Sequence, residues 1–376
     1  MSTFDWYIEI EGKRWKRGIT TGACAAAAAK AAAQALIEQR EISAVEIITP
    51  RGIKLALPIA RCSFTKDEAC CGVVKDAGDD PDSTDGAMIN ATVCWTEQIG
   101  VSILGGEGVG VVTKPGLQIT VGEAAINPVP RELIRRSVEE CLPLEQGVAV
   151  TISVPNGREL ARKTLNPMLG IINGISILGT TGIVEPMSEE AFRTSLAPQI
   201  DVALAAGYNS LVFTPGKIGE SIARRYHIPA EVSILTSNFI GYMLEEASRR
   251  GVKDIVLFGH MGKLVKVAGG IFYTHSKIAD GRMDIIAAEA ANMGASAQQV
   301  GAILDCITTE AALPILQEAG LMGVFHRLAK RASRRAEQYV HGSLRVGTVM
   351  VSLQGAILGI DDNAKIIGGE AGWLLK

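Results

Sequence analysis

The chain lacks an excess of charge of either sign. Charged residues make up 20% of its 376 residues, and the formal net charge is −3, whereas soluble domains carry roughly 25% charged residues. A nearly neutral chain has no general attraction for nucleic acid or for an anionic membrane surface. We therefore expect no nucleic-acid partner, and any anionic ligand must be held by local groups.

The cysteine and histidine patterns of disulfide scaffolds and metal sites are also missing. The seven cysteines include no CxxC pair, which is typical of a reducing cytosol. None of the five histidines has a second one four residues away, the spacing of a helical metal site. The sequence therefore predicts a cytoplasmic protein without a dedicated metal site.

No segment has the pattern of a signal peptide or a membrane span. The first 18 residues contain no apolar core. The richest apolar stretch, 170–184, includes Asn173 and several glycines, and it is shorter than the roughly 20 residues that a spanning helix needs. We expect no membrane association.

Two nucleotide-binding fingerprints are absent, GxGxxG with a following acidic residue and GxxxxGK[ST]. A glycine-rich stretch is present at 103–116, ILGGEGVGVVTKPG, with Lys114 near its end. Glycines let a ligand approach the backbone closely. The stretch faintly resembles the phosphate loop of small-molecule kinases of the galactokinase and homoserine kinase superfamily. A flexible hairpin is the alternative interpretation.

The strongest local signal is an alanine-rich helix at 23–39, ACAAAAAKAAAQALIEQ. Alanine has the highest helix propensity, and Thr20 or Thr21 can serve as the N-cap. The small side chains allow close packing, so a buried helix is one interpretation. The other is that its N-terminal N–H groups form an anion site.

Residues 45–165 alternate short apolar runs with turn residues, which favours strands, and a helix is predicted at 130–141. VAVTISV predicts another strand, which NGRELA could turn back as a hairpin. Strands and a few helices without regular alternation indicate an α+β domain. We place this domain at 1–165.

Beyond residue 165 the pattern changes to strand–turn–helix units. ISILGTTG, NSLVFTPG, VSILTS and DIVLFGHMG predict strands, and the helix expected after the first of them covers 188–207. Such units indicate a mainly parallel sheet between helices. We place a Rossmann-like, three-layer α/β domain at 166–376.

In an open parallel sheet, ligands bind beyond the carboxyl ends of the strands. Those predicted ends are GTTG (179–182), TPGK (214–217), TSN (236–238) and FGHMGK (258–263). Ordinary turn chemistry explains any one of them, but the topology would bring several together. The candidate cofactor-binding residues are Gly179, Thr180, Thr181, Gly182, Thr214, Gly216 and Gly259.

Two segments offer candidate acids or bases. His260 stands at a predicted strand end, where a histidine can act as a general base or simply hydrogen-bond within the loop. VVKDAGDDPDSTDG, 73–86, carries five aspartates, Asp79 and Asp80 among them. Such a loop repels itself unless cations or helix N-termini compensate, and a solvated turn is the alternative. Asp79, Asp80 and His260 are the candidate catalytic residues.

Taken together, these motifs resemble one family, the cobalt-precorrin-5B C1-methyltransferases of anaerobic cobalamin biosynthesis. The matching stretches are RGITTGACAAAAAKAA (17–32), VVKDAGDDPDSTDG (73–86), GGEGVGVVTKPGL (105–117), NPMLGIINGISILGTTGIVEPMSEEAF (166–192), FTPGKIG and LFGHMGK. One departure is Ala23, where a threonine would be expected before the cysteine.

The resemblance implies methyl transfer from S-adenosylmethionine to ring carbon C1 of cobalt-precorrin-5B, giving cobalt-precorrin-6A. Precorrins carry many carboxylates, for which cationic and N–H groups are suitable partners. The candidate substrate-binding residues are Arg17, Thr20, Thr21, Lys75 and Lys114. Two alternative functions remain, a small-molecule kinase using residues 105–110 and a non-enzymatic tetrapyrrole carrier. The sequence does not determine whether the chain forms a homo-oligomer.

Overall fold

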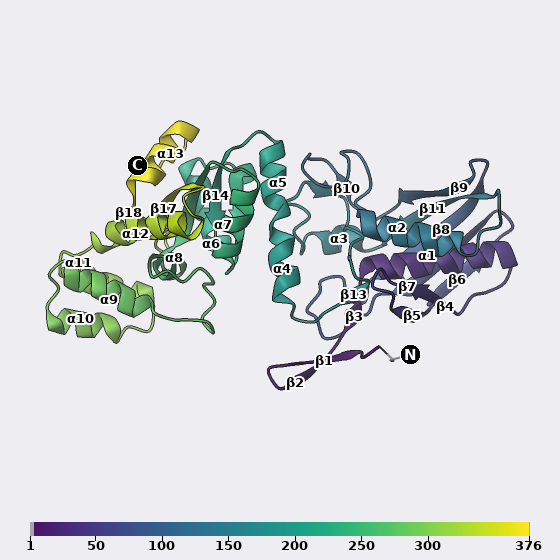
Figure 1. Ribbon diagram of the computed structural model, residues 1–376, viewed down its shortest axis with the longest axis horizontal. Helices are drawn as coiled ribbons and strands as arrows, with labels where there is room; N and C mark the ends of the chain where they lie inside the picture. The colour runs from purple at the N-terminus through teal and green to yellow at the C-terminus, as the bar shows by residue number, and fades with distance from the viewer. Residues whose placement is uncertain (1–3, 376) are drawn as a thin grey trace. The chain divides into compact units, whose positions relative to one another are not determined.

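The computed structural model describes residues 4–375 and divides into two compact units, Met1–Glu189 and Glu190–Lys376. Each unit has its own sheet (Figure 1). The boundary expected at 165/166 lies inside the first unit, and that division into domains stays a prediction.

A five-stranded sheet forms the centre of the first unit, in the order β6-β7-β8-β11-β9. All neighbours pair antiparallel except β11 and β9, which are parallel. Its strands are β6 (Arg61–Phe64), β7 (Glu68–Val74), β8 (Met88–Thr96), β9 (Gly100–Gly105) and β11 (Gly147–Ser153). Two-stranded pairs join β1 (Tyr7–Ile10) to β2 (Lys13–Lys16), β3 (Gly18–Ile19) to β13 (Ile183–Val184), β4 (Ala44–Ile48) to β5 (Lys54–Pro58), and β10 (Val111–Val112) to β12 (Ile171–Ile172).

The alanine-rich segment forms α1 (Thr21–Glu38), which lies beside α2 (Pro128–Glu139) and packs on β7 and β8 (Figure 1). Thr20 is the N-cap, and its hydroxyl accepts from the Ala23 amide at 3.2 Å. The alanines are fully buried, so small side chains serve close packing between the sheet and α2. The predicted helix and its cap are confirmed. The unit mixes α and β elements, as expected.

Two local predictions for this unit were wrong. The segment NGRELA forms a short helix, α3 (Gly157–Ala161), instead of a hairpin. Residues 175–178 are not a strand of the parallel sheet, because Ile175 and Ile177 make only isolated bridges to Val109 and Ile126 of the first unit. The turn 179–182 consequently belongs to the first unit.

The second unit contains the predicted mainly parallel sheet, in the order β15-β14-β16-β17-β18. The first four strands are parallel and β18 is antiparallel to β17. Nearly every residue of β14 and β16 is buried, as expected for a sheet covered on both faces. The strands are β14 (Ser210–Thr214), β15 (Ser233–Leu235), β16 (Asp254–His260), β17 (Arg345–Val351) and β18 (Ile357–Ile360).

Helices pack around this sheet, and α12 contacts β17, β18 and α8. The single helix expected at 188–207 is two, α4 (Glu189–Leu196) and α5 (Pro198–Ala205), because Pro198 lacks the N–H that would continue the ladder. The other helices are α6 (Lys217–Ala223), α7 (Ile240–Arg249), α8 (Met261–Ala268), α9 (Arg282–Asn292), α10 (Ala297–Leu304), α11 (Ala312–Glu318), α12 (Val324–Tyr339) and α13 (Asp362–Ala371). The short turns are η1 (Arg224–Tyr226), η2 (Ala230–Val232) and η3 (Thr309–Ala311).

Between residues 4 and 375, none of the helices combines the length and the apolar character that a bilayer-spanning helix requires.

Candidate functional site

A cavity of about 130 Å³ lies at the N-terminus of α1 in the first unit. It brings together three residues predicted to bind substrate, Thr20, Thr21 and Lys75. The other lining residues are Asp82, Thr84, Thr164, Asn166, Ile175, Ser176, Leu178 and Val184. They come from four separate stretches of chain, so the cavity exists only in the folded unit.

Lys75 supplies a buried cation to this cavity. Its side chain is 1% exposed, and its Nζ lies 2.7 Å from Asp82 Oδ2. The other Asp82 oxygen accepts from the amide and the hydroxyl of Thr84, both at 2.7 Å. Burial opposes ionisation of Asp82, but the Lys75 ammonium and the Thr84 hydrogen bonds hold the pKa of its carboxyl below the usual value.

An ammonium group has three donors, and among the described residues Asp82 is the one hydrogen-bond acceptor of Lys75 Nζ. Two N–H donors of the Lys75 ammonium thus remain available, and the Lys75 side chain lines the cavity. An oxygen-bearing anion that enters the cavity can therefore accept from Lys75 without breaking the ion pair.

Another part of the lining is held by hydrogen bonds that sequence reasoning missed. Asn166 Nδ2 donates to the Gly174 carbonyl at 3.0 Å, and its Oδ1 accepts from the Ser176 hydroxyl at 3.1 Å. Thr21 Oγ1 accepts from the Leu178 amide at 2.9 Å. Asn166 and Ser176 lie within the long motif 166–192, but nothing local in that motif identifies them as partners.

The N–H groups at the start of α1 are already engaged. The Gly22 amide donates to the Leu178 carbonyl at 3.0 Å, the Ala23 amide to Thr20 Oγ1, and the Cys24 amide to the Thr20 carbonyl. Lys75, rather than the helix terminus, is therefore the main attraction for an anion here. Burial raises the pKa of the Cys24 thiol to about 12, which excludes it as a thiolate nucleophile at neutral pH.

The aspartates of the loop 73–86 are stabilised by lysines and backbone amides. Lys16 Nζ pairs with Asp76 at 2.5 Å, and the Lys16 amide donates to Asp79 Oδ2 at 2.6 Å. Asp80 Oδ1 accepts from the Met187 amide at 2.9 Å. Neither Asp79 nor Asp80 lines the cavity around Lys75, so their catalytic roles stay predictions.

Two other residues predicted to bind substrate lie outside the cavity lining. Arg17 pairs with Glu185 at 2.8 Å and donates to the carbonyls of Asp5 and Tyr7, which fixes the chain before β3. The aliphatic part of Lys114 lies so close to Gly170 that a Cβ there would meet it at 2.5 Å.

The turn 179–182 lies beside Thr20. A Cβ on Gly179, whose φ is +122°, would meet Thr20 Cβ at 2.4 Å, and the Thr20 amide donates to the Gly182 carbonyl at 3.1 Å. Thr181 bonds within the turn, to the carbonyl of Ile183, and Thr180 is exposed. These residues therefore adjoin the Lys75 cavity instead of the parallel sheet.

The remaining predicted cofactor residues do meet at the carboxyl edge of the second unit's sheet. Thr214 ends β14, Gly216 precedes α6, and a Cβ on Gly259 would meet the Pro215 ring at 2.9 Å. Lys263 Nζ donates to the Pro215 carbonyl at 2.6 Å. Burial, together with the nearby Lys266 cation, lowers the pKa of Lys263.

His260 lies at this edge, but both of its ring nitrogens are occupied. Nδ1 accepts from the Gly262 amide at 3.2 Å, which places the proton on Nε2, 3.0 Å from Glu310 Oε1. Glu310, which sequence reasoning missed, also accepts from the Leu353 amide at 2.8 Å. In this arrangement His260 caps α8 and ties it to the loop after β17.

Replacing His260 with alanine should lower the free energy of unfolding by about 1–2 kcal/mol, because the cap of α8 is lost. Asparagine keeps an acceptor for the Gly262 amide, so His260→Asn should cost less. Urea titrations of both variants measure the difference. Equal stability of the two variants would contradict the capping role.

The glycine-rich stretch 105–110 is a packed crossing of backbones. A Cβ on Gly108, whose φ is +70°, would lie 1.8 Å from the Val154 carbonyl oxygen. A Cβ on Gly157 or Gly174 would lie 2.0 or 2.2 Å from the Gly108 carbonyl oxygen. The glycines serve protein packing, so the structure gives no support to a phosphate loop here, and the kinase alternative loses its motif.

Within residues 4–375, no three histidine, cysteine or acidic side chains converge as ligands for a metal ion.

Comparison with known proteins identifies the family. A family model described as CbiD matches residues 8–186, and one described as CbiD, C-terminal domain, matches 273–362. A protein from Moorella thermoacetica named cobalt-precorrin-5B C(1)-methyltransferase is 52% identical over 363 residues, covering 96% of this chain and 99% of its own.

Proteins of the same name are similar in a second bacterium and in an archaeon. The one from Desulfitobacterium hafniense is 49% identical and covers 95% of this chain and 92% of its own. The one from Methanocaldococcus jannaschii is 47% identical, and the match covers 92% of this chain and 96% of its own. A crystal structure of the cobalamin biosynthesis protein CbiD from Archaeoglobus fulgidus matches with 31% identity and a TM-score of 0.40, covering 70% of this chain and 83% of that one.

Proposed function

The chain belongs to the CbiD family, and on that premise we propose that it methylates C1 of cobalt-precorrin-5B to give cobalt-precorrin-6A, with S-adenosylmethionine as donor. The observation that carries this proposal is the identity of 52% across 96% of the chain to a relative that bears the name of this activity. The expected working environment is the cytoplasm, with a cobalt-precorrin as the partner and no nucleic acid.

The cavity around Lys75 fits one side arm of the substrate. Its volume of about 130 Å³ is below the roughly 300–1,000 Å³ of sites that enclose a whole ligand. A single acetate or propionate arm would place its carboxylate against the Lys75 ammonium and the Thr20 and Thr21 side of the lining. A charge-assisted hydrogen bond to a buried cation holds such an arm firmly, which fixes the ring for methyl transfer.

For the donor we propose the carboxyl edge of the parallel sheet in the second unit, a Rossmann-like position where cofactors bind in open α/β folds. Thr214, Gly216 and Gly259 meet there. Residues 179–182 adjoin Thr20, so we assign them to the substrate side. Methyl transfer is an in-line displacement at a cationic sulfur, which mainly requires alignment and exclusion of water.

A base is needed only if the macrocycle must lose a proton before it attacks the methyl group. Asp79, Asp80 and His260 remain the proposed candidates, although each already has a hydrogen-bond partner in the fold. Each candidate base is tested by its own substitution: Asp79→Asn, Asp80→Asn and His260→Asn. A variant that retains full turnover removes its residue from the list.

The decisive experiment is anaerobic incubation of the protein with cobalt-precorrin-5B and donor labelled in its methyl group, followed by mass spectrometry of the corrinoid. One labelled methyl group at C1 is expected, together with demethylated donor. Consumption of ATP without methyl transfer would instead indicate a kinase. Corrinoid binding without loss of donor would indicate a carrier.

Replacing Lys75 with methionine should lower kcat/KM for the corrinoid about 10- to 100-fold, since a hydrogen bond between charged groups contributes about 1.5–3 kcal/mol. KM for the donor should stay within about twofold. Steady-state kinetics on protein shown to be folded by circular dichroism measure both. Lys66→Met, at an exposed lysine of the same unit, is the matched control, and equal losses in both variants would contradict the assignment.

A further inference from the structure

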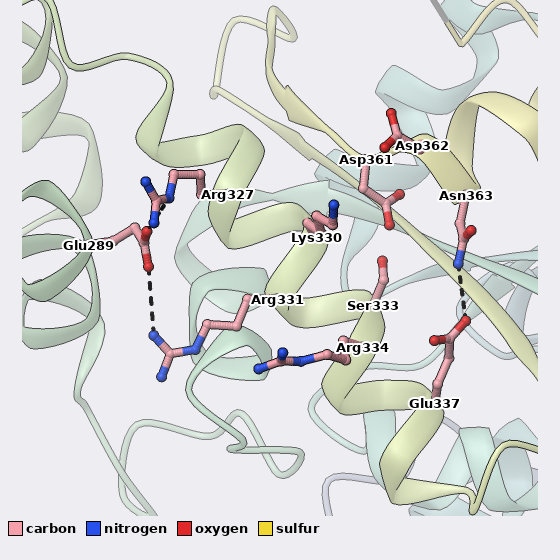
Figure 2. Close-up of a pocket in the computed structure, with 10 residues that line it drawn as sticks. All are labelled: Glu289, Arg327, Lys330, Arg331, Ser333, Arg334, Glu337, Asp361, Asp362 and Asn363. Carbon is pink, nitrogen blue, oxygen red and sulfur yellow. Dashed lines mark hydrogen bonds and ion pairs between the residues drawn. The ribbon is translucent and has the colours of Figure 1, made fainter. Parts of the chain in front are cut away.

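The second unit contains a larger hollow, of about 570 Å³, along one side of α12. Figure 2 shows the side chains that line it. They are Glu289, Arg327, Lys330, Arg331, Ser333, Arg334, Glu337, Asp361, Asp362 and Asn363. The volume lies within the roughly 300–1,000 Å³ of small-molecule sites.

Four cationic side chains of α12 line the hollow: Arg327, Lys330, Arg331 and Arg334. Their spacing of three and four residues puts them on one face of the helix, while Leu328, Ala329, Ala332 and Ala336 are buried. Like charges at such spacing destabilise a helix by about 0.2–0.5 kcal/mol per pair. The stripe therefore needs compensating negative charge.

The protein supplies that charge to two of the four cations. Glu289, whose side chain is 10% exposed, lies 2.5 Å from Arg327 Nε and 3.9 Å from Arg331 Nη1. Among the described residues, no ion pair or hydrogen bond is formed by the side chain of Lys330 or Arg334. In Figure 2, Arg331 and Arg334 extend from α12 toward the same side.

Most other carboxylates of the lining are committed to the fold. Glu337 Oε1 accepts from the Val346 amide at 3.1 Å and from Asn363 Nδ2 at 3.0 Å. Asp361 caps α13 and accepts from the Thr348 and Ala364 amides, and burial raises the pKa of its carboxyl. Asp362 is exposed in the first turn of α13, where a negative charge suits the helix dipole.

We propose that this hollow binds a small molecule that carries several carboxylates, with Lys330 and Arg334 as the main contacts. A guanidinium forms paired hydrogen bonds with a carboxylate, and an ammonium adds a compact charge. Two unpaired cations one helical turn apart thus receive two carboxylates of one ligand. This anion site goes beyond the methyl transfer proposed above and rests on the geometry of the second unit alone.

The test uses uroporphyrin, a tetrapyrrole with eight carboxylates, as a fluorescent probe of the full-length protein. The double variant Lys330→Gln/Arg334→Gln should bind it at least about tenfold more weakly than the wild type, with a shallower dependence on salt. The matched control Lys253→Gln/Arg224→Gln removes two exposed cations outside the hollow and should bind it as the wild type does. Equal affinity of all three proteins would overturn the proposal.

A protection measurement distinguishes carboxylates from phosphates. Arg334 should be protected from guanidine-specific labelling by uroporphyrin. Pyrophosphate tests the other source of anionic groups, and it overturns the carboxylate proposal if it protects Arg334 while uroporphyrin does not.

The melting temperature distinguishes a binding role of Lys330 and Arg334 from a structural role. Because Lys330 and Arg334 lack partners among residues 4–375, their removal relieves repulsion along α12. The double variant should therefore melt at the same temperature as the wild type or slightly higher. A fall of several degrees would show that the two charges are structural and would count against the proposal.

Discussion

Replacing Asp82 with asparagine should lower the free energy of unfolding of the first unit by about 3–5 kcal/mol at neutral pH, the cost of stranding one member of a buried ion pair. Lys75 is the reason, because its side chain is 1% exposed and Asp82 is its counter-ion at 2.7 Å. Asparagine keeps the shape and an acceptor for the Thr84 amide but supplies no charge. Urea titration followed by the fluorescence of the first unit's tryptophans measures the loss.

The pH dependence gives the same prediction an independent check. The folded state lowers the pKa of Asp82, so its ionised form contributes stability above the unfolded pKa of about 3.9. That contribution disappears as the pH falls through the lower folded pKa. The difference between wild type and Asp82→Asn should therefore be full at pH 7 and shrink below about pH 4.

Two comparison variants show whether the stranded charge is the cause. Asp67→Asn, at an exposed aspartate of the same unit, should change the free energy of unfolding by less than about 0.5 kcal/mol. Lys75→Met/Asp82→Leu removes both charges and should recover much of the loss, since apolar replacements of buried pairs are often neutral. If Asp82→Asn alone were as stable as the wild type at pH 7, Lys75 would have to be neutral or solvated.

Signals that are local in sequence predicted the elements that depend on local physics. The alanine run determines α1, and a hydroxyl at Thr20 determines where it starts, because propensity and capping act within a few residues. The alternation of apolar strands and helices likewise predicted the parallel strands β14, β15 and β16. The amphipathic pattern of α12 was also present and was overlooked.

Two of the errors were local, because Pro198 already marked the break in the helix expected at 188–207 and NGRELA forms the helix α3. The misplaced turn 179–182 depends instead on contacts between distant parts of the chain. The turn 179–182 has the same glycines and threonines as a strand-end loop, and only its contact with Thr20 reveals the unit to which it belongs. The residues that line the cavity around Lys75 likewise could not all be predicted from local sequence. Lys75 was a candidate from its charge, but Asn166 and Ser176 became recognisable only when the fold placed them in the lining of the same cavity.

The second large effect is expected at Gly108, where alanine should prevent the first unit from folding stably. Two costs add at this position. The φ of +70° is a left-handed conformation, which costs a residue with a Cβ about 1–2 kcal/mol. The new Cβ would also lie 1.8 Å from the Val154 carbonyl oxygen, and backbone on both sides leaves no flexible side chain to move away.

A matched variant separates the two costs. Gly52 has a φ of +77° and nothing within 4 Å of an added Cβ, so Gly52→Ala reports the backbone conformation alone and should cost about 1–2 kcal/mol. Gly108→Ala should lose at least about 4 kcal/mol, the range of exceptional substitutions, with a large fall in soluble yield. Thermal melts and urea titrations compare the two. If both variants lost the same stability, the chain around 108 would be able to move apart, and a ligand-binding loop at 105–110 would again be possible.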